Sequence, residues 1–185
     1  AMSRELMLQA KEVAEDMGFM VLHMYVDCLF VQQDGFHKPS DFTPLMKAIE
    51  EKTGIPIALE GVFKWVAFLA SKRDARVPVP NQYFGAFQDG TLKYRGIELR
   101  RRDTTLWVRK TQLKALEILA HANSPREFAD RVPDVMNLME DAKRELRIGR
   151  VPLDELVIRQ RLSRTVEAYK TPSPAAHAAL QLQAH

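Results

Sequence analysis

The 185-residue sequence predicts an α+β fold: a mostly antiparallel sheet with helices on one face, followed by a purely helical part. Three observations support this prediction. Over the first hundred residues, amphipathic segments alternate with short runs of branched and aromatic residues. Tight turns join some of these runs directly, as in antiparallel hairpins. Beyond Asp103 only helical periodicity continues, so we expect one domain over residues 1–104 and a helical domain over residues 105–185.

The first elements are predicted from apolar spacing and glycine stops. Apolar residues spaced by four, three and four predict a helix over residues 4–17, which Gly18 ends. Residues 19–31 are β-rich but interrupted near Val26-Asp27, which indicates a hairpin. A second helix is expected over residues 41–52, which Gly54 ends. The apolar face of the first helix comprises Leu6, Ala10, Val13 and Met17.

The next segments are predicted to be strands. Residues 55–69 are branched or aromatic with Gly61 in their midst, which suits two strands or one bent strand. Residues 83–86 and 92–99 indicate two further strands, joined through the tight-turn pair Asp89-Gly90. Together with the hairpin, these runs supply the antiparallel sheet.

The helical part has its own start and stop signals. Ser124, a proline and a glutamate three residues after the serine form a capping box, so a long helix should begin there. Its apolar stripe continues to Gly149, which ends it. We expect a third helix over residues 153–169, and a last Ala/Leu-rich helix after the proline-containing segment 171–174.

Composition narrows the class of protein. No apolar run approaches the roughly 20 residues that span a bilayer, so the sequence predicts no membrane segment and, by default, a cytoplasmic location. The only cysteine, Cys28, excludes an intrachain disulfide and a cysteine-cluster zinc site. Residues 1–90 have a net charge of −3 and residues 91–185 a net charge of +6. The basic half is the candidate for binding a polyanion, although plain solvated helices can be equally basic.

One carboxylate stands where the two runs of the first hairpin meet. In His23-Met24-Tyr25-Val26-Asp27-Cys28-Leu29-Phe30-Val31, the interruption falls at Asp27. A carboxylate at a hairpin tip is held by rigid strands and left exposed by the turn, and carboxylates are the ligands that hard divalent cations prefer. The alternative is that an aspartate stands there for turn geometry alone.

This nine-residue segment resembles the Tyr-Gly-Asp-Thr-Asp-Ser-Leu-Phe-Val hairpin of family B DNA polymerases. Residues 4–19 resemble the palm helix before that hairpin, and Asn81-Gln82-Tyr83 stands where the family has Lys-Lys-Arg-Tyr. Residues 96–103 resemble its Gly-Ile-Glu-x-x-Arg-Arg-Asp segment, and residues 151–158 its closing thumb helices. The resemblance implies a partial palm over residues 1–104 and a thumb over residues 105–185 of a longer DNA-directed DNA polymerase.

The resemblance also implies a catalytic role and some departures from it. Asp27 would be a catalytic metal ligand for Mg²⁺, in a site completed by a carboxylate from upstream sequence. Tyr25 stands at the position of the family's first aspartate, and its neutral phenol cannot replace a carboxylate. Met24 replaces the adjacent glycine. We therefore expect the chain alone not to polymerise, while the full-length protein would bind a deoxynucleoside triphosphate.

Primer-template duplex DNA is the partner that the resemblance implies. Asn81 and Gln82 carry amides where the family motif has positive charges, so we expect them to form hydrogen bonds with DNA rather than to attract its phosphates. Three consecutive arginines, expected on a strand, would alternate between its faces, with one of them solvated or paired with Asp103. The candidate DNA-binding residues are Asn81, Gln82, Tyr83, Arg100, Arg101, Arg102 and Lys110.

Two other functions remain open at this point. Tyr25, Met24 and the amide pair also fit a catalytically degenerate polymerase descendant that acts as a DNA-binding or scaffolding module. Alternatively, the chain is a basic α+β interaction domain with an accidental likeness to polymerases, since short motifs do match by chance.

Overall fold

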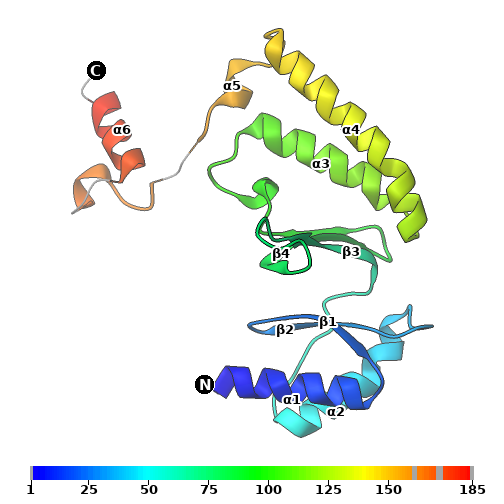
Figure 1. Ribbon diagram of the computed structural model, residues 1–185. Coiled ribbons are helices and arrows are strands. Elements are labelled where there is room, and N and C mark those ends of the chain that lie inside the picture. The colour runs from blue at the N-terminus through cyan, green and yellow to red at the C-terminus, as the bar shows by residue number, and fades with distance from the viewer. Residues whose placement is uncertain (1, 160–161, 170–172, 184–185) are drawn as a thin grey trace. The chain divides into compact units, whose positions relative to one another are not determined.

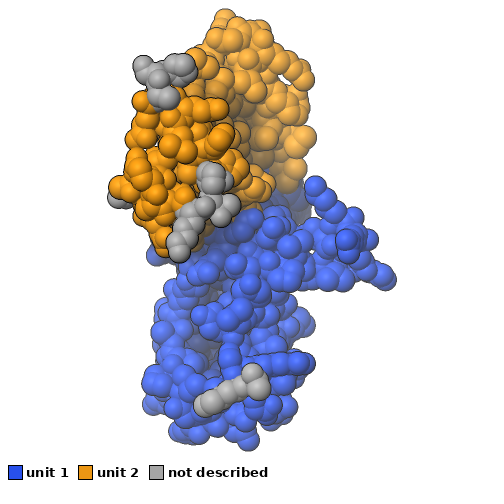
Figure 2. All heavy atoms as spheres, turned by 90° about the vertical axis from the view of Figure 1, so that its left-hand side faces the viewer, with its two compact units in different colours: residues 1–96, 119–131 blue, residues 97–118, 132–185 orange. Residues whose placement is uncertain are grey.

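The computed structural model describes residues 2–159, 162–169 and 173–183 (Figure 1). The chain divides into two compact units, which Figure 2 shows in different colours. Unit 1 comprises residues 1–96 and 119–131, and unit 2 comprises residues 97–118 and 132–185. Residues 119–131 include the end of one long helix and the start of the next, so both helices contribute to both units.

Helix α1 (Met2–Asp16) begins unit 1, where the sequence predicts a helix. It ends in a Schellman motif, because Gly18 adopts a φ of +84° that favours glycine. The Gly18 N–H donates to the Glu15 carbonyl at 2.9 Å, and the Phe19 N–H donates to the Ala14 carbonyl at 2.9 Å. These bonds satisfy the last carbonyls of the helix and turn the chain into the first strand.

Strands β1 (Met20–Tyr25) and β2 (Cys28–Gln32) form the predicted antiparallel hairpin. Their register shifts between Val21 and His23, which marks a bulge in β1. A 3-10 turn (Pro39–Phe42) follows the connecting loop.

Helix α2 (Thr43–Thr53) packs with α1 beneath this hairpin (Figure 1). Gly54, with a φ of +70°, ends α2 at the predicted position. The buried apolar cluster comprises Ala10, Ala14, Phe19, Phe42, Leu45 and Ile49. Of the face predicted for α1, Ala10 is buried but Met17 is 37% exposed, because the chain turns away from the helix there.

A second sheet completes unit 1. Strands β3 (Phe63–Ala70), β4 (Pro78–Phe87) and β5 (Leu92–Arg95) pair antiparallel in the order β3-β4-β5. The predicted Asp89-Gly90 turn joins β4 to β5, and Gly90 has a φ of +87°. The Thr91 N–H donates to the Asp89 carboxylate at 2.8 Å, which closes this turn.

Aromatic rings connect the two sheets within unit 1. The Phe30 ring of β2 lies 5.3 Å from the Phe68 ring of β3 and 5.1 Å from the Tyr83 ring of β4, both edge to face. His23 of β1 lies 4.9 Å from Phe68, measured between ring centroids. Edge-to-face pairs of this kind contribute about 0.5–1.5 kcal/mol beyond their buried area. The hairpin and the larger sheet are therefore held together by side-chain packing.

The rest of the chain is mainly helical, as the sequence predicts after Asp103. Its elements are a 3-10 turn (Glu98–Arg100), α3 (Leu106–Ala120), α4 (Pro125–Arg147), α5 (Leu153–Leu156), a 3-10 turn (Val166–Ala168) and α6 (Pro174–Gln183). The serine cap is confirmed, since the Glu127 N–H donates to the Ser124 hydroxyl at 3.2 Å. The Glu127 carboxylate accepts the Asn123 N–H at 3.0 Å, one residue before the position that a full capping box uses. Gly149, with a φ of +70°, follows the end of α4.

Three expected elements differ from the structure. The helix expected over residues 153–169 is wrong, because only α5 and a 3-10 turn form in the described part of this range; residues 160–161 lie outside the description. The strand expected over residues 92–99 ends at Arg95, where Gly96 adopts a φ of +64°. Residues 55–62 form no strand; here the Ile57 N–H donates to the Glu50 carboxylate instead of to a neighbouring strand.

The architecture is thus a mixture of helices and antiparallel sheets, as expected. The division into a palm over residues 1–104 and a thumb over residues 105–185 stays a prediction. Within the described ranges, every helix is too short or too polar to cross a lipid bilayer.

Candidate functional site

Asp27 lies at the tip of the β1–β2 hairpin. Tyr25 and Cys28 form the last strand pair, so Val26 and Asp27 make the turn. The Asp27 N–H donates to the Tyr25 carbonyl at 2.6 Å, which closes a turn of three residues. The Asp27 side chain is exposed, so two paired strands present its carboxylate to solvent.

The turn before Asp27 holds an unusual backbone conformation. Val26 has a φ of +48°, in the left-handed region where a β-branched side chain crowds its own backbone. Its side chain is 63% exposed, so burial of Val26 does not offset this strain. Residues in such conformations cost on the order of 1–3 kcal/mol and cluster at functional sites. The β1–β2 pairing and the aromatic contacts of Phe30 must hold the turn in place.

Further charged groups gather around the end of this hairpin. Burial raises the pKa of the Cys28 thiol, and the negative charges of Asp27 and Glu60 raise it further, while the Arg95 guanidinium acts in the opposite direction. The thiol donates to the Tyr25 carbonyl at 3.2 Å. A raised pKa keeps Cys28 protonated and unreactive near neutral pH. Asp27, Glu60 and Arg95 therefore each lie near enough to Cys28 to shift the pKa of its thiol.

Glu60 has a cation beside it. Its carboxylate forms an ion pair with the ammonium group of Lys93 on β5, whose side chain is only 21% exposed. Lys93 and Arg95 stand two residues apart on the same strand and therefore on the same face of the sheet. This face brings two positive charges to the neighbourhood of the two carboxylates.

The side chains at the hairpin include the type of ligand that a hard divalent cation prefers, but too few such ligands to hold one. Asp27 offers carboxylate oxygens, which such cations prefer, but the neighbouring Tyr25 offers only a neutral phenol. Glu60 is engaged by Lys93. In the part of the chain that the structure describes, no group of three or more His, Cys, Asp or Glu side chains is arranged to hold a metal ion. A complete site would need donors from outside these residues.

Asn81 and Gln82 lie in a wide bulge of strand β4. Phe68 of β3 pairs with Tyr83, but Ala70 pairs with Pro78, so four residues of β4 stand against one of β3. Asn81 has a φ of +57°, an uncommon conformation that asparagine tolerates better than most residues. Both amide side chains are partly exposed. The bulge therefore lifts the amide pair out of the regular ladder, as bulges beside functional sites do.

Gly96 makes room for this bulge. A Cβ atom at Gly96 would lie 2.3 Å from the Asn81 carbonyl oxygen and 2.7 Å from Cγ of Gln82. Only glycine allows the chain after β5 to pass so close to the bulge. Tyr83, the next residue, is 4% exposed and packs against Phe30. Its ring anchors the end of the bulge in the core.

Arg100 ends a 3-10 turn and Arg101 and Arg102 follow it, so the expectation that the three arginines lie on a strand is wrong. The side-chain carbonyl of Gln112 on α3 accepts the Leu99 N–H at 2.6 Å, which binds this turn to the helix instead of to a sheet. Arg101 makes two hydrogen bonds with the Asp103 carboxylate, at 2.7 and 3.0 Å. The side-chain hydrogen bond to Asp103 raises the pKa of Arg101. The expected pairing of one arginine with Asp103 is thus confirmed, while Arg100 and Arg102 are exposed.

Lys110 lies in unit 2, on a groove of about 350 Å³ lined by α3, α4 and α5. Its ammonium group forms a 2.6 Å ion pair with Glu155 of α5. Trp107 and Lys114 of α3 also line the groove, and α4 contributes both apolar and acidic side chains. The groove thus carries charges of both signs, and Lys110 is one of its exposed residues. Trp65, in unit 1, packs edge to face against Phe128, with the ring centroids 4.9 Å apart.

Comparison with known proteins identifies the family. The sequence profile of DNA polymerase family B matches residues 9–185. The chain belongs to DNA polymerase family B. The alternative of a basic interaction domain with an accidental likeness is therefore wrong, because the match covers almost the whole chain rather than isolated motifs.

Relatives in this family include archaeal and viral enzymes. The chain is 28% identical over 181 residues to the DNA polymerase of Archaeoglobus fulgidus, covering 98% of this chain and 21% of that protein. It is 27% identical over 180 residues to the DNA polymerase catalytic subunit of Saimiriine herpesvirus 2, covering 84% and 17%. The family B DNA polymerase of Pyrobaculum calidifontis has a similar structure, with a TM-score of 0.56 and 27% identity over 98% of this chain and 21% of that one. The chain spans about a fifth of the length of these relatives.

Sequence reasoning placed Asp27 and the amide pair on the family's motifs but missed two cations beside the hairpin. Lys93 and Arg95 influence the site only because β5 runs next to the segment that holds Glu60. Because side chains alternate between the two faces of a strand, the predicted strand places Lys93 and Arg95 on the same face. Their position near Glu60 depends on a side-chain contact between residues 33 apart in the sequence, which no local pattern indicates.

Proposed function

We propose that this chain is the C-terminal palm and thumb part of a DNA-directed DNA polymerase and that it holds primer-template duplex DNA. Residues 1–104 form the palm part and residues 105–185 the thumb. The observation that carries the proposal is an exposed carboxylate, Asp27, at the tip of a hairpin in a chain that belongs to family B over residues 9–185. The β1–β2 pair fixes the direction of that carboxylate, which is what a catalytic group requires.

In the longer protein, Asp27 would be one ligand of a divalent metal ion, which we take to be Mg²⁺. Family B polymerases use divalent metal ions, and a metal in this position would neutralise the charge that develops on the transferred phosphoryl group of a deoxynucleoside triphosphate. The other carboxylate ligands would come from sequence outside this chain. Within the chain, β1 and β2 orient Asp27. Tyr25 stands where the family has a second carboxylate, so that ligand is missing. We therefore propose that the chain alone does not polymerise.

The residues proposed to contact the duplex are the amide bulge and a group of basic side chains. The Asn81–Gln82 bulge would offer amide groups for hydrogen bonds to sugar or base edges, and buried Tyr83 would hold that bulge in place. Arg100 and Arg102, which are exposed, would contact phosphates. Arg101 and Lys110 already have carboxylate partners in Asp103 and Glu155, so they would contribute less unless those pairs open.

Two measurements test this function. Fluorescence anisotropy of a labelled primer-template duplex, titrated with the 185-residue chain, should show binding that weakens as salt rises. Primer extension should be absent with the chain alone. With the product of the complete reading frame, extension should be present and should disappear in Asp27→Ala but persist in Asp34→Ala, a matched change at another exposed aspartate of unit 1. Extension that survives Asp27→Ala would exclude the catalytic role of Asp27.

A second function is favoured by the composition of the hairpin site. Tyr25 replaces one family carboxylate, and Lys93 is ion-paired with Glu60, so the site has fewer free negative charges than a two-metal centre needs. This fits a degenerate polymerase descendant that binds or scaffolds DNA without catalysis. Tight, salt-sensitive duplex binding without extension by the complete gene product would establish this function instead.

A further inference from the structure

The loop that joins β3 to β4 is strongly basic within an otherwise acidic half of the chain. Residues 71–77 carry Lys72, Arg73 and Arg76 against one acid, Asp74, whereas residues 1–90 as a whole have a net charge of −3. The loop closes at the Ala70–Pro78 strand pair. Positive charge is thus concentrated at one end of the β3–β4 hairpin.

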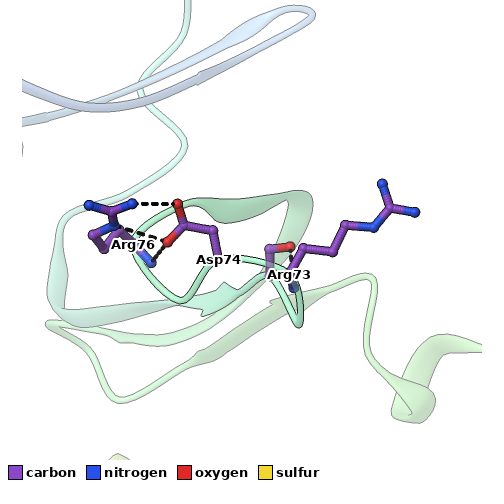
Figure 3. Close-up of polar contacts among 4 residues, drawn as sticks. Arg73, Asp74 and Arg76 are labelled. Carbon is purple, nitrogen blue, oxygen red and sulfur yellow. Dashed lines mark hydrogen bonds and ion pairs between the residues drawn. The ribbon is translucent and has the colours of Figure 1, made fainter.

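Hydrogen bonds within the loop give it a defined shape (Figure 3). The Asp74 carboxylate accepts the Arg76 backbone N–H at 3.0 Å and two guanidinium N–H groups at 3.0 and 3.1 Å. The Ser71 hydroxyl accepts the Arg73 N–H at 3.2 Å. The Val77 N–H also donates to the Asp74 carbonyl, at 3.1 Å. These bonds hold the backbone of a loop that has no apolar core of its own.

The loop cations fall into two kinds. Arg76 is neutralised by Asp74, and this side-chain hydrogen bond raises the pKa of Arg76 and lowers the pKa of Asp74. Lys72 and Arg73 are exposed, and among the ion pairs of the described residues neither takes part in one. In Figure 3 the Arg73 side chain extends away from the Asp74–Arg76 pair. Two free positive charges therefore project from an ordered loop.

We propose that Lys72 and Arg73 contact the phosphate backbone of duplex DNA bound at the Asn81–Gln82 bulge. This inference rests on the proposed function, because it assumes that a duplex lies at the bulge. The bulge begins directly after Pro78, the residue that closes the loop, so the cations and the amides belong to one end of one hairpin. Asn81 and Gln82 stand where the family motif that they resemble has charged residues. Lys72 and Arg73 place two positive charges at the same end of this hairpin.

The expected effect follows from counterion release. Each phosphate contact contributes about 0.9 to the slope of log affinity against log salt concentration for duplex DNA. Two contacts therefore contribute about 1.8 to this slope, and loss of both makes binding less sensitive to salt. A pair of solvated lysines or arginines that touches no phosphate contributes much less, because it displaces no counterions from the DNA.

The experiment compares two double variants of the full chain with the same change in net charge. Lys72→Gln/Arg73→Gln removes the loop cations. Lys47→Gln/Lys52→Gln removes two exposed lysines of α2, in the same unit but on a helix. Anisotropy titrations of a labelled primer-template duplex are run at several salt concentrations between about 50 and 200 mM, the range over which such contacts are resolved. Circular dichroism and urea unfolding establish that both variants are folded.

The proposal expects the loop variant to lose about 1.8 from the slope while the α2 variant keeps the slope of the unmodified chain. Equal slopes for the unmodified chain and a folded loop variant would overturn the proposal while leaving the proposed function intact. An equal drop in both variants would also overturn it, because the effect would then be one of net charge alone. If the unmodified chain shows no salt-dependent duplex binding, the proposed function fails and this inference fails with it.

Discussion

Replacing Gly96 by alanine should both destabilise the chain and displace the Asn81–Gln82 bulge. Gly96 has a φ of +64°, and an alanine in this region costs about 1–2 kcal/mol relative to its usual conformations. The added Cβ would lie 2.3 Å from the Asn81 carbonyl oxygen, so main chain must move. Overpacking of this kind costs about 1–3 kcal/mol. We therefore expect Gly96→Ala to lower the free energy of unfolding by about 2–5 kcal/mol.

Gly90→Ala is the matched control. Gly90 has a similar left-handed φ, +87°, and lies in the same β4–β5 hairpin, but a Cβ there meets no atom within 4 Å. Only the backbone cost of about 1–2 kcal/mol should appear. Urea unfolding, followed by far-ultraviolet circular dichroism, measures both variants against the unmodified chain. Duplex affinity, measured by anisotropy, should fall more for Gly96→Ala than for Gly90→Ala.

Equal losses of stability in the two variants would refute this reasoning. They would mean that the bulge yields to an added methyl group without cost, so that its position is not set by Gly96. Asn81 and Gln82 would then be mobile in solution, and their role in holding a duplex would lose its structural basis.

Three further outcomes are expected. Arg100→Ala and Arg102→Ala should each reduce the salt slope of duplex binding, measured by anisotropy titration, by about 0.9. Arg101→Ala should reduce it less, because Arg101 is paired with the Asp103 carboxylate. Equal effects of the three substitutions would contradict this expectation. Ser124→Ala should lower the free energy of unfolding by about 1 kcal/mol through loss of the α4 N-cap, measured by urea denaturation, and Ser124→Asp should largely restore it. Burial lowers the pKa of His23 from 6.5, so the unfolded chain takes up a proton first as pH falls. Stability should therefore decrease below about pH 6.5, less so in His23→Phe, and parallel pH profiles for the two proteins would exclude His23 as the cause.

Local signals predicted much of the fold. Helices α1, α2 and α4 end just before Gly18, Gly54 and Gly149, which all have a positive φ. Such an end could be predicted because it requires only a glycine next to the last turn of the helix. The start of α4 follows from Ser124 and Glu127 for the same reason. The β1–β2 hairpin was also predicted, since its strands are adjacent in sequence.

The errors arise where distant residues decide the structure. The apolar spacing of Leu162, Val166 and Tyr169 predicts a long helix, but Val166 is buried in a 3-10 turn that contacts α6. Tertiary packing of this kind overrides the helical preference of a short segment. The 3-10 turn that ends at Arg100 depends on Gln112, thirteen residues from the Leu99 N–H that it accepts. Sequence periodicity contains no information about such partners.

The candidate site shows the same division. Asp27 could be placed at a hairpin tip from nine consecutive residues. The Glu60–Lys93 ion pair and the influence of Arg95 on Cys28 depend on which strands pair, so no local pattern indicated them. Similarly, the bulge at Asn81 is a mismatch between β3 and β4 that appears only when both strands are aligned.

The ring contacts between the hairpin and the larger sheet have a mechanical consequence. Phe30 touches both Phe68 and Tyr83, so the strand that follows Asp27 cannot slide without disturbing the residue that anchors the Asn81–Gln82 bulge. The hairpin that carries Asp27 and the strand that carries the amide bulge are thus linked through packed aromatic rings of unit 1. A substitution that removes one of these rings would disturb both features together.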